Sequence, residues 1–382
     1  MAGDRVGLLL EGIRPSDRLI EIGPSFNPVA PKSAGWQVTV VDHASQAGLV
    51  EKYTGNPHVD VRRIEAVDVV WQGGPLETAV PAADHGRYAA LIASHVIEHI
   101  PDVIGFLRSV QVLLHPTEGR LILAVPDKRF CFDVFRPVST TGHLLAAHKA
   151  LRGRHIAAHM FDHVAYKSSL NGQGAWARQP LGDGLRLDHS LDQAMAQFEA
   201  ITPDGDYVDC HAWQFTPASF ALLILELSDL GLIDWQVEWS AAQPATEFLV
   251  RLRRGRRHFP SAEAREAARL ALLREMLLEL REQTDWMIDA SAPPPRRHPW
   301  TCPPASMPST PGCGRWPRRR CPHRPLRRRG AGGAAPGARG LAPPAAAAPG
   351  GGALARPRLS RLRGRPAPRR RSRRRRCGRR RA

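Results

Sequence analysis

The sequence predicts an α/β fold, a mostly parallel sheet with helices on both of its faces. Short apolar runs at 18–23, 38–42 and 88–94 read as buried strands, and helix-like stretches separate them. A glycine turn at Gly23 closes the first run, and Asp42 closes the second run 19 positions later. Because strands alternate with helices, the pattern favours parallel pairing through helical crossovers.

The other expected elements follow the chain in order. They are strands at 59–67, 120–125, 234–240 and 247–252, helices that begin at Pro101-Asp102 and at Thr216-Pro217, and a long helix at 261–289. The last two strands should form an antiparallel finish to the sheet.

The stretch at 130–212 is expected to be an insert after the fifth strand. It is too long for a plain connection, so a lid or substrate module is the natural interpretation. The loops at the carboxyl ends of parallel strands frame a bound ligand, and the insert should therefore cover that cleft. The candidates to face the cleft are Arg136, His143, Asp162 and His211.

The strongly basic charge belongs to one end of the chain. Residues 291–382 hold 26 Arg and no Lys, Asp or Glu, which leaves 28 basic against 36 acidic residues in the first 290. A segment of Arg, Pro, Ala and Gly cannot bury enough apolar surface to fold, so we expect a disordered tail. Its composition is typical of GC-rich DNA read in a shifted frame. As a natural product it would bind nucleic acid through counterion release.

Cysteine usage and hydropathy indicate a cytoplasmic protein. Only Cys131 and Cys210 lie in the first 290 residues, too few for a disulfide framework. We expect no signal peptide, because the N-terminus lacks a basic region followed by a long apolar run. No apolar run approaches 18 residues, so we also expect no membrane helix.

Three motifs together carry a family resemblance. Glu21–Pro28 reads EIGPSFNP, Ala93–Asp102 reads ASHVIEHIPD, and Val125–Pro137 reads VPDKRFCFDVFRP. The combination resembles a bacterial branch of the class I S-adenosylmethionine-dependent methyltransferases, over residues 15–255. The resemblance implies a Rossmann-like, seven-stranded sheet in residues 1–255. The helical period of the residues that follow predicts an amphipathic helix at 256–290. It also implies S-adenosylmethionine as cofactor and a small-molecule acceptor, for example a sugar or glycan.

The resemblance also implies which residues hold the cofactor. They are Glu21, Gly23, Ser25, Asn27, Asp42, Glu65, Asp68, Ser94 and His95. Ser25 and Asn27 stand where the family usually has further glycines, which argues against a dinucleotide, because a pyrophosphate needs the second glycine. Asp42 would bind the ribose hydroxyls, or else cap a helix. Glu65 and Asp68 would reach the adenine from the loop after strand three, or else be surface charges.

The candidates for catalysis are His95, His99 and Asp127, which follow strands four and five. Each could act as a base or contact the acceptor, although a histidine of ordinary pKa is also a frequent structural group. In some relatives an acid at the position of Glu98 binds a metal, and in most it only supports the turn. We expect no metal site.

Three further features leave alternatives open. His155, His159 and His163 repeat every four residues, which would suit zinc, but no Cys or paired Glu accompanies them, so a polar lid face is expected. The basic tail allows RNA methylation, which predicts a steep salt dependence. The apolar stripe of the 261–289 helix, formed by Leu270, Leu273, Met276, Leu277 and Leu280, allows a non-catalytic assembly module.

Overall fold

The computed structural model describes residues 5–202, 204–243 and 246–287. The expected tail at 291–382, with its suspected frame shift, and the end of the expected 256–290 helix lie outside these residues. Within the described part, no helix is both long and apolar enough to cross a membrane.

The centre of the fold is a seven-stranded sheet in the order β3-β2-β1-β4-β5-β9-β8. The strands are β1 (Leu19–Ile22), β2 (Val38–Asp42), β3 (Val69–Val70), β4 (Ala90–Ser94), β5 (Arg120–Pro126), β8 (Trp235–Ala242) and β9 (Glu247–Arg254). β1 to β5 pair in parallel, and β9 runs antiparallel to both β5 and β8. The expected α/β sheet with an antiparallel finish is confirmed.

The third strand differs from the prediction. The sequence suggested residues 59–67, but β3 comprises only Val69 and Val70, and Val61–Arg63 forms a 3-10 turn. Asp60 caps this turn by accepting a hydrogen bond from the amide of Arg62. Arg62 and Arg63 of this turn are exposed to solvent.

The helices are α1 (Arg5–Leu9), α2 (Gln46–Tyr53), α3 (Leu76–Ala79), α4 (Val103–Leu113), α5 (Thr141–Lys149), α6 (Ala157–Ala165), α7 (Leu191–Ala200), α8 (Pro217–Asp229) and α9 (Ala262–Met287). The two predicted helix starts are correct for a local reason. The Asp102 carboxylate accepts from the amide of Gly105, and the Thr216 hydroxyl accepts from that of Ser219. Both are N-caps that satisfy amides left free in the first turn.

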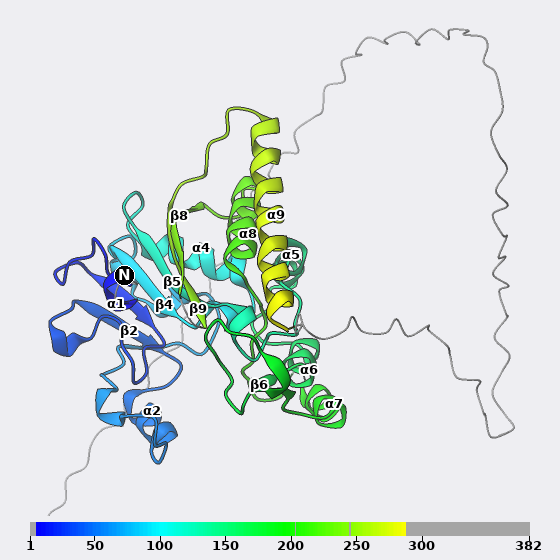
Figure 1. Cartoon of the computed structure of the whole chain (residues 1–382). Helices are drawn as coiled ribbons and strands as arrows, with labels where there is room; N and C mark the ends of the chain where they lie inside the picture. The colour runs from blue at the N-terminus through cyan, green and yellow to red at the C-terminus, as the bar shows by residue number, and fades with distance from the viewer. Residues whose placement is uncertain (1–4, 203, 244–245, 288–382) are drawn as a thin grey trace, which may run out of the picture. The chain divides into compact units, whose positions relative to one another are not determined.

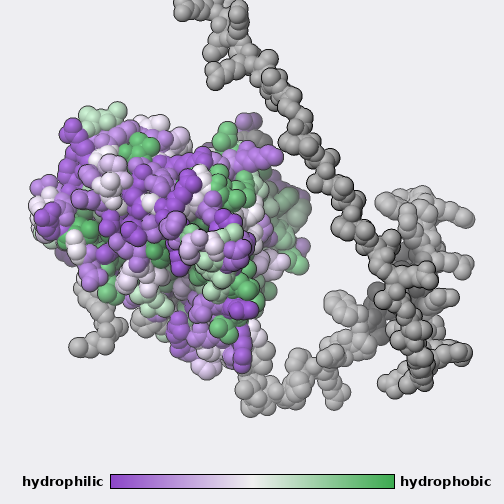
Figure 2. Space-filling model, turned by 90° about the horizontal axis from the view of Figure 1, so that it is seen from above, coloured by the Kyte–Doolittle hydropathy of each residue, from purple (hydrophilic) through white to green (hydrophobic). Residues whose placement is uncertain are grey.

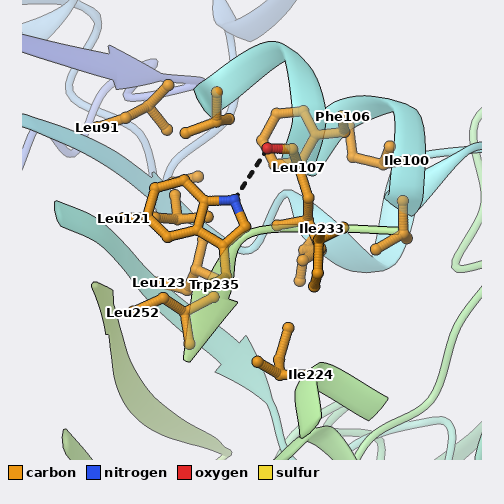
Figure 3. Close-up of a cluster of buried hydrophobic side chains, with 14 of the residues drawn as sticks. Leu91, Ile100, Phe106, Leu107, Leu121, Leu123, Ile224, Ile233, Trp235 and Leu252 are labelled. Carbon is orange, nitrogen blue, oxygen red and sulfur yellow. Dashed lines mark hydrogen bonds between the residues drawn. The ribbon is translucent and has the colours of Figure 1, made fainter. Parts of the chain in front are cut away.

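One face of the sheet carries the larger core. Leu91, Leu121 and Leu123 of the strands pack there against α4 and α8. Trp235 lies in the middle, fully buried, and donates its indole N–H to the carbonyl of Leu107 at 2.9 Å (Figure 3). The hydrogen bond satisfies the one polar atom of this side chain, so the indole can fill the core without an unpaired donor.

The opposite face has a smaller core and little helix. Ile92, Ile122 and Leu249 pack there against Leu9 of the short α1 and against Val29 in the loop after β1. Both faces of the sheet are covered, as expected. On the second face, however, the loop after β1 provides much of the cover that a helix was expected to provide.

The insert begins after β5 and contains α5, α6, α7 and a two-stranded sheet, β6 (Ser168–Leu170) with β7 (Leu185–Leu187). Its elements β6, α6 and α7 lie at one end of the large sheet (Figure 1). The end of the insert is tied to the loop after β4, because the amide of Ala212 donates to the carbonyl of Glu98 at 2.8 Å. The insert therefore lies where the ligand of a parallel sheet is expected.

The long helix α9 packs on α8, but its apolar stripe is only partly used (Figure 1). Leu273, Met276 and Leu280 are half-buried, whereas Leu270 and Leu277 are exposed. The buried residue of the helix is Gln283, whose side chain donates to the carbonyl of Val134. Seen from above, hydrophilic side chains dominate the surface (Figure 2).

Candidate active site

The turn after β1 is held open by a buried acid. Gly23 has a φ of +64° and Ser25 a φ of +44°. The Glu21 carboxylate is 2 % exposed, and its two oxygens accept from the amides of Val29 and Ala30 at 2.7 and 3.0 Å. Burial raises the pKa of Glu21 to about 6. Through these two hydrogen bonds the buried Glu21 fixes the conformation of the loop after β1, while Gly23 and Asn27 of the same loop are exposed.

Asp42 ends β2 and has one oxygen without a partner. The side chain is 4 % exposed, and Oδ1 accepts from the amide of His43 at 2.8 Å and lies 2.7 Å from its Nδ1. Among the described residues Oδ2 has no hydrogen-bond partner, and the same holds for the buried hydroxyl of Ser25. The helix-cap alternative fails, because Ser45 caps α2. A buried, unpaired carboxylate oxygen is costly and is available to a ligand hydroxyl.

The structure corrects the expected position of Glu65 and Asp68, the two candidates for contacts to the adenine. Because β3 begins at Val69, Glu65 and Asp68 precede the strand instead of following it. Glu65 already accepts from the amides of Lys32 and Ser33, and Asp68 accepts from the amide of Val40. The loop after β3 instead starts at Trp71, whose ring stacks on Phe106 with centroids 6.3 Å apart.

Glu65 lines a cavity of about 540 Å³ between residues 28–33 and 62–66. This cavity lies between the loop after β1 and the segment before β3. Asn27 reaches towards the same segment, since its Oδ1 accepts from Arg63 at 3.4 Å.

The loop after β4 contains a residue in a rare backbone conformation. His95 has a φ of +54°, a region that non-glycine residues seldom adopt and that often marks a functional site. Its Nε2 lies 2.9 Å from Glu247, which also accepts from Arg5. Burial alone would raise the pKa of Glu247, but the hydrogen bonds from His95 and Arg5 outweigh it and lower the pKa to about 2. Arg5 also donates to the hydroxyl of Ser94 at 2.6 Å.

The next turn contains a buried glutamate, Glu98, with His99 and His211 beside it and His95 Nδ1 also 3.8 Å from its Oε1. Glu98 is 1 % exposed, and among the described residues neither of its oxygens has a hydrogen-bond partner. His99 Nε2 lies 3.8 Å and His211 Nε2 lies 3.9 Å from Glu98 Oε1. The two rings meet edge to face, with centroids 4.6 Å apart. His211 comes from the end of the insert, so the cluster joins the insert to β4.

Each of these histidines turns its other nitrogen to a carboxylate. His99 Nδ1 lies 2.9 Å from Asp209, and His211 Nδ1 lies 2.5 Å from Asp133. Burial would lower the pKa of His99, but Asp209 and Glu98 outweigh it and raise the pKa. Burial would raise the pKa of Asp133, but His211 and Arg136 outweigh it and lower the pKa. The carboxylates therefore fix both imidazole rings with Nε2 towards Glu98.

Asp127 does not reach the site, which corrects the prediction of a catalytic role. The side chain is 1 % exposed, and its oxygens accept from the guanidinium of Arg129 at 2.9 and 2.7 Å. Arg129 is itself 1 % exposed and also contacts Glu282 of α9. The acid at the end of β5 is thus half of a buried ion pair.

Of the insert residues expected to face the cleft, His211 alone belongs to the Glu98 cluster. Arg136 is buried and donates to Asp133 and to the carbonyl of His211, so it acts behind the cluster. His143 is exposed and completes the cap of α5, and Asp162 is exposed on α6.

The histidine repeat of the insert does not form the expected polar lid face, although the ring centroids of His155 and His159 lie 6.1 Å apart. His155 precedes α6, whereas His159 and His163 lie within it. Burial lowers the pKa of His159 to about 3 and that of His163 to about 4. His159 packs edge to face against Trp213, so these imidazoles are partly buried packing groups instead of a polar surface.

The sequence was compared with models of protein families. Residues 2–176 match a family model described as a methyltransferase domain. The match covers β1 to β5, the turn at Gly23, Asp42 and the loop after β4, and it ends within the insert. It therefore includes the part of the sheet at which the unpaired Asp42 oxygen lies. A comparison with curated proteins gives no match.

Solved structures with a related arrangement have low similarity. One is described as a Zn-dependent alcohol dehydrogenase from Rhodobacter sphaeroides (16 % identity, TM-score 0.35, covering 66 % of this chain and 89 % of that one). Another is described as an S-adenosylmethionine-dependent methyltransferase from Listeria monocytogenes (11 % identity, TM-score 0.34, covering 65 % of this chain and 94 % of that one). A third is the 1,6-didemethyltoxoflavin-N1-methyltransferase of Burkholderia thailandensis, with S-adenosylhomocysteine bound (14 % identity, TM-score 0.31, covering 66 % of this chain and 76 % of that one). The fold of this chain is defined by its own strand order, β3-β2-β1-β4-β5-β9-β8.

Proposed function

We propose that this chain is a methyltransferase that binds S-adenosylmethionine at the carboxyl ends of β1, β2 and β4 and transfers its methyl group to a small-molecule acceptor. The observation that carries the proposal is Oδ2 of Asp42, which is buried at the end of β2 and has no hydrogen-bond partner among the described residues. Acids at this place in an α/β sheet bind ribose hydroxyls. The matching family model supports methyl transfer as the reaction.

The residues around Asp42 suit a nucleoside with a short charged tail. Gly23 has no side chain in the turn after β1, so the backbone can approach the ligand closely. The hydroxyl of Ser25, which has no partner in the part of the chain that the structure describes, offers a further hydrogen bond from the same turn. The sulfonium of the cofactor supplies an activated methyl group. The protein then has to align the acceptor, exclude water and take up a proton.

His95 is the residue that we propose for the proton. Its side chain is 42 % exposed at the end of β4, and Glu247 orients the ring through Nε2. A base held by a carboxylate in this way keeps one orientation and one tautomer. The insert approaches the same loop through Ala212 and His211, which supports an acceptor site between the loop and the insert.

Binding of the cofactor tests the first part of the proposal. Calorimetry with S-adenosylhomocysteine should show that Asp42→Asn weakens binding by about 10- to 150-fold, the equivalent of losing a charge-assisted hydrogen bond of about 1.5–3 kcal/mol. Asp234→Asn is the matched control, because this acid directly precedes β8, has a 41 % exposed side chain and lies 3.5 Å from Arg254 Nη2. Unchanged affinity in Asp42→Asn would remove Asp42 from the site. Tight NAD binding without affinity for S-adenosylmethionine would overturn the proposal.

The acceptor is tested separately. Comparing metabolites of strains with and without the gene, followed by turnover with labelled S-adenosylmethionine, should identify a small molecule with a hydroxyl, amine or carboxyl group, for which we favour a sugar or glycan. An RNA acceptor bound through the basic tail would instead give a rate that falls steeply with salt. Cofactor binding without turnover on any acceptor would favour an assembly module.

A further inference from the structure

We propose that Glu98, His99 and His211 bind a divalent transition-metal ion at the junction of β4 and the insert. The proposal concerns a second ligand besides the methyl donor, and it does not depend on the identity of that donor. It rests on three observations of the cluster: its distances, the unpaired glutamate, and the carboxylates behind the histidines.

The distances fit ligands of one ion better than hydrogen bonds. Nε2 of His99 and Nε2 of His211 lie 3.8 and 3.9 Å from Glu98 Oε1, and the three ligand atoms lie within 4.8 Å of one another. A nitrogen-to-oxygen hydrogen bond is typically about 2.7–3.2 Å long. Two atoms that each bind an ion at about 2.0–2.2 Å lie roughly 3 to 4 Å apart.

No hydrogen bond compensates the glutamate within the described part of the chain, although His95 Nδ1 also lies 3.8 Å from Oε1. Glu98 is 1 % exposed, and among the described residues no donor bonds to either of its oxygens. Burying a carboxylate without hydrogen bonds costs free energy that native folds normally avoid. The side chain is the natural anchor for a cation at this point.

The outer partners orient the two imidazoles as ligands. Asp209 and Asp133 each hold one Nδ1, which leaves Nε2 of His99 and His211 turned towards Glu98. A carboxylate on the far nitrogen is the usual support of a metal-bound histidine, because it fixes the ring and strengthens the ligand. Three carboxylates and the guanidinium of Arg136, which bonds to Asp133, give a local charge of −2, suited to a dication.

The ligand set indicates the kind of ion. Two imidazoles and one carboxylate suit zinc or ferrous iron, whereas magnesium and calcium prefer oxygen ligands. Three protein ligands leave coordination positions open. An oxygen atom of the acceptor could therefore bind the ion directly; this last step rests on the proposed function, whereas metal binding does not.

The test uses the full chain, stripped of metal with a chelator and titrated with zinc chloride. The wild type should bind one equivalent more than Glu98→Gln, which keeps the shape of the side chain. Counting the difference removes any zinc held by the cysteines beyond residue 300. His58→Ala is the matched control, since this exposed histidine lies outside the cluster and should bind as the wild type does. Cobalt should give visible absorption bands in the wild type that Glu98→Gln and His211→Ala lose.

Asp209→Asn provides a variant with all three ligands intact. It should keep the equivalent of zinc but bind it about 10- to 100-fold more weakly, the usual effect of removing an outer partner. Equal zinc stoichiometry in the wild type and in well-folded Glu98→Gln and His211→Ala would overturn the proposal. Magnesium binding as tight as zinc binding would also overturn it. Binding of S-adenosylhomocysteine, measured on the same samples without metal, tells a failed metal site from a failed cofactor site.

Discussion

Replacing Asp127 by asparagine should lower the stability of the fold strongly and change the catalytic activity little. The acid accepts three hydrogen bonds from Arg129, from its amide at 3.1 Å, from Nε at 2.9 Å and from Nη2 at 2.7 Å. In the Asp127→Asn variant one carboxylate oxygen becomes an amino group that faces a donor, and the buried guanidinium loses its nearest counter-charge. Breaking a buried ion pair on one side typically costs about 3–5 kcal/mol. Glu282 also contacts Arg129, so the low end of this range is expected.

The measurement is thermal unfolding, followed by circular dichroism. A loss of about 3 kcal/mol should lower the Tm by roughly 6–12 °C in a domain of this size. Asp60→Asn is a close geometric control, because Asp60 accepts from the amide, Nε and Nη2 of Arg62 in the same pattern. That pair is exposed, so its Tm should hardly change. A Tm close to the wild type together with lost turnover in Asp127→Asn would refute the structural role and restore Asp127 as a catalytic candidate.

Two further predictions concern the turn after β1 and a buried lysine. Gly23→Ala should destabilise the fold by about 1–2 kcal/mol, because Gly23 has a positive φ, and it should also weaken binding of S-adenosylhomocysteine. Gly55→Ala is the control: Gly55 has a φ of +88° away from the site, so this variant should change stability alone. Equal cofactor affinity in both variants would argue against the turn as a binding element. Burial lowers the pKa of Lys128 from 10.5 to about 8, so the folded state releases this proton first and its stability should rise by about 3 kcal/mol between pH 8 and 10.5. Urea unfolding should show this rise in the wild type and not in Lys128→Met, and parallel pH profiles would contradict it.

Much of the sheet could be predicted because its signals are local. The apolar runs that became β1, β2, β4 and β5 end in Gly, in Pro or in polar residues, and the alternation with helices indicates parallel order. β3 escaped prediction because two residues are too few to show any periodicity. Its position then shifted Glu65 and Asp68 from after the strand to before it.

The site was predictable only where neighbouring residues define it. Asp42 follows from its spacing to Gly23, and its free oxygen agrees with a binding role. Asp127 misled, because an acid at a strand end looks functional until Arg129, two residues later, folds back on it. His211 lies more than a hundred positions from Glu98, and no spacing in the sequence indicates that they meet. The adjacent acid and imidazole of Glu98-His99 were the available signal.

The antiparallel pairing of β5 with β9 also sets an order of events during synthesis. The 120 residues from 127 to 246 separate the two strands, so the edge of β5 has no partner until they have been translated. At about 5–20 residues per second the ribosome needs about 6–24 s for this stretch. During that interval β5, with Leu121 to Val125 all destined for the core, offers an open strand edge to other chains. A message that ends within the insert would leave that edge unpaired for good, and its product should aggregate.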